Sequence, residues 1–67
     1  GFDYAYLNTG VAYAQKGDLD NAIRYLQFAT RINPNLKEAF QYLANIYQQK
    51  GDAKTAQEYM NKANGMK

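Results

Sequence analysis

The side chains that most often carry out catalysis are scarce in this sequence. Histidine, cysteine and serine are absent, which removes the usual nucleophile–base pairs, the commonest metal ligand and any disulfide bond. The carboxylates stand alone or precede stretches with helical spacing, where capping explains them. We therefore expect no enzymatic activity, no metal and no cofactor.

One short segment comes closest to a metal site. Asp18-Leu19-Asp20-Asn21 has the opening residues of a calcium loop. Such a loop needs an oxygen ligand at its fifth residue, glycine at its sixth and glutamate at its twelfth. The chain has Ala22, Ile23 and Ala29 at those places, so helix capping is the favoured role for both aspartates.

The charged side chains predict no polyanionic partner. Eight basic and six acidic residues leave a net charge of +2. Four cations are expected on the outer helices and could touch phosphate: Arg24, Arg31, Lys54 and Lys62. Asp20 and Glu58 interrupt them, which favours a solvated face with loose ion pairs. We expect no nucleic-acid partner, and no membrane partner either, because no apolar run approaches the roughly 20 residues of a membrane span.

The sequence repeats itself at a spacing of 34 residues. Nine positions are identical at this offset: Ala5/Ala39, Tyr13/Tyr47, Gln15/Gln49, Lys16/Lys50, Gly17/Gly51, Asp18/Asp52, Ala22/Ala56, Tyr25/Tyr59 and Ala29/Ala63. A fixed period in this range is typical of repeat proteins, in which each unit is one supersecondary element stacked on the next.

Apolar residues recur at three and four positions, which predicts helices rather than strands. Four are expected, at about 3–16, 19–32, 36–50 and 53–64. Gly17-Asp18 and Gly51-Asp52 should each end one helix with a positive-φ glycine and cap the next with the aspartate. Around Pro34, the pair Asn35 and Glu38 predicts a capping box for the third helix.

Small residues are placed where two helices should cross closely, and large residues lie beside them. The small set is Gly10, Ala22, Ala29, Ala44, Ala56 and Ala63, and the large set is Tyr6, Tyr13, Leu26, Phe40, Tyr47 and Met60. Alternation of this kind lets facing layers interdigitate. The short connections force antiparallel helix hairpins.

These residues resemble two tetratricopeptide repeats, at about 3–36 and 37–67. The family pattern falls on Tyr6, Gly10, Tyr13, Gly17-Asp18, Ala22, Leu26, Ala29 and Pro34, and then on Phe40, Ala44, Tyr47, Gly51-Asp52, Ala56, Met60 and Ala63. The resemblance implies an all-α fold of two antiparallel helix-turn-helix repeats, stacked as a short right-handed α-solenoid. Residues 1–67 would form one domain, alone or as a fragment of a longer array.

The resemblance also implies a function, namely non-catalytic binding of a peptide or helix in a concave groove. By carry-over, the groove residues are Tyr4, Leu7, Asn8, Val11, Gln41, Tyr42, Asn45, Gln48 and Gln49, with Ala14, Gln15 and Glu38 beside them. A subset of the family clamps acidic tails with cations and amides. Leu7, Val11 and Tyr42 replace those groups here, so a neutral or apolar protein segment is expected.

Alternatives remain for several of these residues. Leu7 and Val11 could form an exposed apolar patch with Tyr4 or pack against their neighbours. Asn45, Gln48 and Gln49 could bond a peptide backbone or belong to a solvated face. The tyrosines could stack on bases, which an RNA-binding helical repeat would need, but packing is favoured for most of them.

Structural self-assembly is the alternative function. Two repeats fall below the three usually needed for a continuous core. The inward residues Tyr59, Met60 and Ala63 are expected to leave one flank open, and the first helix spreads apolar residues around more than one face. We therefore expect a homo-oligomer, or further repeats that complete the stack.

Overall fold

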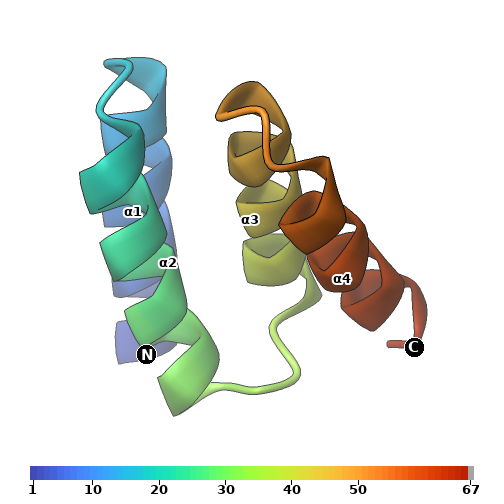
Figure 1. Cartoon of the computed structure of the whole chain (residues 1–67). Coiled ribbons are helices and arrows are strands. Elements are labelled where there is room, and N and C mark those ends of the chain that lie inside the picture. Colours follow the sequence, from blue (N-terminus) through green and yellow to red (C-terminus); the bar gives the residue numbers. More distant parts are fainter. Residues whose placement is uncertain (67) are drawn as a thin grey trace.

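The computed structural model describes residues 1–66, which form four helices and no strand: α1 (Phe2–Gln15), α2 (Leu19–Ile32), α3 (Lys37–Gln49) and α4 (Ala53–Asn64). Helices α1 and α2 form one antiparallel hairpin, α3 and α4 form a second, and residues 33–36 connect them (Figure 1). The predicted all-α fold of two stacked hairpins is therefore confirmed. None of these four helices is long and apolar enough to cross a membrane.

The two hairpin turns have the same construction, as the repeated Gly-Asp predicts. Gly17 and Gly51 have φ angles of 85° and 84°, which is the left-handed region that glycine tolerates best. The amide of Asp18 donates to the carbonyl of Tyr13 at 2.9 Å, and Asp52 does the same to Tyr47, which completes a Schellman ending for each helix.

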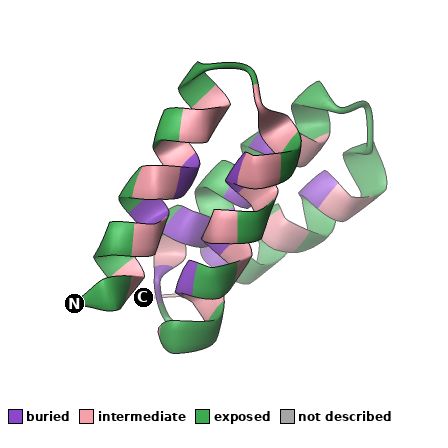
Figure 2. Ribbon diagram, turned by 90° about the vertical axis from the view of Figure 1, so that its left-hand side faces the viewer, coloured by how far each residue is buried: buried purple, intermediate pink, exposed green. Residues whose placement is uncertain are grey.

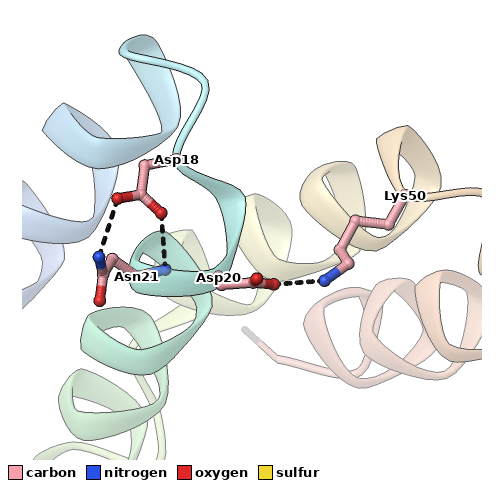
Figure 3. Close-up of polar contacts among 4 residues, drawn as sticks. All are labelled: Asp18, Asp20, Asn21 and Lys50. Atoms are coloured by element: carbon pink, nitrogen blue, oxygen red, sulfur yellow. Dashed lines mark hydrogen bonds and ion pairs between the residues drawn. The ribbon is translucent and has the colours of Figure 1, made fainter.

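The same two aspartates cap the helices that follow. The carboxylate of Asp18 accepts from the backbone amide of Asn21 at 3.3 Å, and that of Asp52 accepts from Thr55 at 3.1 Å. The Asn21 side chain also donates to Asp18 at 2.8 Å (Figure 3). These bonds satisfy amides that would otherwise lack a partner in the first helical turn.

The predicted capping box of α3 is wrong. The N-cap residue is Leu36, and no side chain caps this helix. The Asn33 side chain instead accepts from the Asn35 amide at 3.0 Å and donates to the Asp3 carboxylate at 3.0 Å. Pro34 lies inside this asparagine turn, and α3 therefore begins later than the Asn35 pattern suggests.

The core is the seam between the two hairpins. Its fully buried members are small or branched apolar residues from three helices: Leu7, Ala22, Leu26, Ala29, Leu36, Ala39, Leu43 and Ile46. Gly10 lies where α1 and α2 cross, and a Cβ there would meet Leu26 Cγ at 2.8 Å and the Ala22 carbonyl oxygen at 3.1 Å. Buried residues accordingly line the inner sides of the ribbon (Figure 2).

Each hairpin also holds a pair of stacked tyrosines. Tyr13 and Tyr25 lie 5.4 Å apart between ring centroids, at 8° between their planes, and Tyr47 and Tyr59 lie 5.6 Å apart at 19°. Tyr6 joins the first pair through Tyr25. The structural role predicted for these five tyrosines is confirmed.

Two residues predicted on packed faces are exposed. Ile32 ends the apolar stripe of α2 but is half exposed, and Met60, expected to fill space at a helix crossing, is 37% exposed. Within residues 1–66, no segment covers the side of α4 that carries Met60.

Candidate functional site

The most developed surface feature with mixed polarity is a groove between α3 and α4. Its lining residues are Gln41, Ala44, Asn45, Gln48, Ala56, Gln57 and Met60, and its volume is about 350 Å³. Ala44 and Ala56 are buried and form the floor, whereas the four amide side chains and Met60 are exposed. We call this feature the amide groove.

Helical spacing brings these residues together. Positions 41, 44, 45 and 48 share one face of α3, and positions 56, 57 and 60 share one face of α4, because side chains three and four residues apart are neighbours on a helix. The alanines allow the two helices to approach closely. The Asn45 oxygen accepts from the Gln49 side chain at 3.5 Å, and the Asn61 oxygen accepts from Gln57 at 2.9 Å, so neighbouring amides support the groove's walls.

An ion pair joins the two hairpins beside the core seam. Lys50, which follows α3, donates to the carboxylate of Asp20 in the first turn of α2 (Figure 3). This hydrogen bond, with the attraction between the two charges, lowers the pKa of Asp20 below its ordinary value of 3.8. The hydrogen bond likewise raises the pKa of Lys50 above 10.5, against a smaller opposing effect of desolvation.

Comparison with known families agrees with this architecture. Tetratricopeptide repeat models match residues 4–36 and residues 37–67. The chain belongs to the tetratricopeptide repeat family. No individual curated protein matches it. Tetratricopeptide repeats are generally non-catalytic modules for protein–protein interaction.

Three of the residues predicted to bind a partner gather in the amide groove of this tetratricopeptide pair. Gln41, Asn45 and Gln48 line it directly, and Gln49 is bonded to Asn45 at its edge. Tyr42 on the same helix is 39% exposed but is not a lining residue. Tyr4 is 50% exposed and Asn8 is also exposed, both on the first hairpin.

The exposed apolar patch expected at Leu7 and Val11 is wrong. Leu7 is only 5% exposed and belongs to the buried cluster shared with Leu43 and Ile46 of α3. Val11 is half-buried and packs against the same cluster. The second repeat already covers these two side chains, so neither is free for a partner.

Sequence reasoning missed Gln57 and Met60, the wall that α4 contributes. A signal for them exists in the repeat itself. Their counterparts 34 residues earlier are Ile23 and Leu26, and Leu26 is fully buried. A change from a buried apolar residue to an amide or an exposed methionine marks a surface with a different neighbour.

The remaining candidate sites of the tetratricopeptide pair have structural explanations. No group of three or more acidic side chains able to hold a metal occurs in residues 1–66, and Asp18 and Asp52 are used as helix caps. Arg24 and Arg31 border a shallow hollow on α2 with Asp20 and Phe28. An acidic and an aromatic side chain among these cations agree with a mixed surface.

Proposed function

We propose that this chain binds a neutral protein segment in the amide groove, as a single module or within a longer array. The observation that supports this is the gathering of Gln41, Asn45 and Gln48 over a buried alanine floor, opposite Met60. Such a surface combines hydrogen-bonding walls with an apolar base, which is the usual composition of a site that fixes a ligand's orientation.

The chemistry of the lining selects against acidic tails. None of the seven lining residues is charged, so the groove offers no cation to a terminal carboxylate. Amides both donate and accept hydrogen bonds, which suits backbone groups or neutral polar side chains. Met60 is unbranched and adapts to apolar groups of different shape.

Tyr4, Asn8, Tyr42 and Gln49 extend this proposal beyond the groove. All four are exposed, and exposed tyrosines supply large contact area together with a hydrogen-bonding hydroxyl. A bound segment longer than the groove would reach these residues on the side where α1 and α3 are neighbours.

Selection of binders from a library of displayed peptides tests the proposal. We expect neutral peptides to be enriched, and we expect Met60→Glu or Gln48→Glu to abolish their binding while leaving the circular dichroism spectrum unchanged. Gln15→Glu, on the first hairpin outside the groove, is the matched control and should bind normally. Enrichment of acidic C-terminal tails, or selected peptides insensitive to both groove substitutions, would contradict the proposal.

Self-association is the second candidate, and a different surface supports it. Phe2 is 77% exposed, and Phe28 and Ile32 are also exposed. Large apolar side chains of this kind are typical of contact surfaces. Sedimentation equilibrium over a wide concentration range tests this candidate, and Phe2→Asn together with Ile32→Asn should abolish any association.

A further inference from the structure

The first hairpin shows what occupies a surface equivalent to the amide groove. Subtracting 34 from each lining residue gives Leu7, Gly10, Val11, Ala14, Ala22, Ile23 and Leu26. These residues are buried or partly covered where α3 packs against the first hairpin. The internal seam is thus a template, in which a helix lies on the equivalent site.

The chemistry of the two sites differs at the positions that meet this helix. Leu7, Val11 and Ile23 become Gln41, Asn45 and Gln57 in the groove. Covering an amide with leucine or isoleucine removes its water without replacing the hydrogen bonds, which is unfavourable. A helix with the apolar contact residues of α3 therefore does not fit, whereas small or hydroxyl-bearing residues over the alanine floor do.

The charge beside the site is also reversed. In the seam, Asp20 of the first hairpin pairs with Lys50 at the end of the docked helix. The residue equivalent to Asp20 is Lys54, which is exposed. A helix docked in the groove in the same way needs a carboxylate where α3 is followed by Lys50.

A second copy of the chain meets only half of these requirements. Its α1 carries Ala5, Thr9 and Ala12 at the positions of the α3 contact residues, and these are small or polar. However, Lys16 stands at the position of Lys50 and would approach Lys54, which places like charges together. The groove therefore disfavours head-to-tail stacking of identical chains.

We infer that the amide groove docks a helix of another protein, lying as α3 lies on the first hairpin, with a small or polar contact face and one carboxylate near Lys54. This inference rests on the proposed function and specifies the form and charge of the bound segment. It is set against extended peptides, apolar helices and a second copy as the occupant.

Three helical peptides that differ in these features provide the test. The first, constrained by a lactam bridge, has the sequence of residues 1–17 with Lys16→Glu. The second keeps Lys16, and the third has residues 35–51, the equivalent segment with the apolar contact face. Each is titrated into the 15N-labelled chain, and the side-chain NH2 signals of Gln41, Asn45, Gln48 and Gln57 are followed by NMR.

We expect the Lys16→Glu peptide to bind at the groove about fivefold more tightly than the native peptide at low salt, since exposed charge pairs have modest effects. Salt should reduce this ratio. The order of the two should reverse in the Lys54→Glu variant and become equal in Lys54→Gln. The third peptide should perturb the groove signals least.

Equal binding of the first two peptides, strongest binding of the third, or self-association of the unaltered chain through the groove would overturn the inference. If display-selected peptides move the groove signals but the Lys16→Glu helix does not, the inference fails and the proposed function stands. If neither moves them, both fail.

Discussion

The two hairpins are near copies at their turns and differ on their outer faces. Gly17 and Gly51 adopt φ angles within 1° of each other, at 85° and 84°, and Asp18 and Asp52 cap the next helices in the same way. The faces that point away from each hairpin's own partner helix have changed, because buried Leu26 of the first corresponds to exposed Met60 of the second.

This difference separates two kinds of information in a repeated sequence. Residues that fold a hairpin on itself recur at 34 positions, whereas residues that meet a neighbour follow the identity of that neighbour. Departures from the period therefore locate binding surfaces better than the period does.

Leu26 and Met60 provide the largest expected contrast. Leu26→Ala removes a fully buried side chain and should lower the free energy of unfolding by about 2–5 kcal/mol, close to the whole stability of about 3–5 kcal/mol expected for a domain of this size. Met60→Ala should cost about 1 kcal/mol or less, because its side chain already contacts water. Urea unfolding followed by circular dichroism measures both, and equal losses would contradict the difference between the faces.

Gly10 and Ala44 should respond to opposite substitutions with the same sign. Gly10→Ala places a Cβ 2.8 Å from Leu26 Cγ and 3.1 Å from the Ala22 carbonyl oxygen, and overpacking of this kind costs about 1–3 kcal/mol. Ala44→Gly should cost about 1 kcal/mol through lost helix propensity. Thermal unfolding measures both, and a stabilised Gly10→Ala variant would show that the first crossing has room for a methyl group.

The two turn glycines should be equally sensitive. Gly17→Val and Gly51→Val each force a β-branched residue into the left-handed region, at a cost of about 1–3 kcal/mol, although a Cβ at either position would meet nothing within 4 Å. The asparagine variants are the controls and should cost less, because asparagine tolerates this conformation. A clear inequality between the two valine variants would mean that one turn has contacts with a neighbour that the other lacks.

The ion pair between the hairpins should have the smallest effect, confined to the ends of the pH range. Because the pKa of Asp20 is lowered on folding, its contribution is present above the ordinary value of 3.8 and is lost as the pH falls through the lowered value. The pKa of Lys50 is raised, so its contribution is complete below 10.5 and is lost as the pH rises through the raised value. The Asp20 side chain is 86% exposed, which limits the effect.

A double-mutant cycle isolates this pair. Melting temperatures of the unaltered chain, Asp20→Asn, Lys50→Met and the double variant are compared from pH 2 to pH 7. The coupling between the two positions should be present at pH 7 and absent at pH 2. Coupling that persists at pH 2 would show that the contact does not depend on the charge of Asp20.

Much of the fold could be predicted because it depends on local chemistry. Helical spacing placed all four helices within two residues of their observed ends, and Gly-Asp predicted both turns. The capping of α3 could not be predicted, since Asn33 bonds to Asp3, which lies 30 residues away. The contact between Asp20 and Lys50 also spans 30 residues, and neither residue alone indicates a partner.

The candidate site was only partly predictable for a related reason. Family positions indicated Gln41, Asn45 and Gln48, but they gave Leu7 and Val11 equal standing, because the pattern does not show which hairpin covers which face. Gln57 and Met60 lie on the other helix and become relevant only when α4 is packed against α3. Packing between elements, rather than spacing within one, determines these residues.

The stacked tyrosines give each hairpin its own optical reporter. The chain has no tryptophan, so near-ultraviolet circular dichroism arises from tyrosine and phenylalanine rings held in fixed orientations. Tyr13 and Tyr25 report only on the first hairpin, and Tyr47 and Tyr59 only on the second. Replacing one pair with phenylalanine leaves the tyrosine signal of the other, so two single-pair variants can reveal whether the hairpins melt together or one after the other.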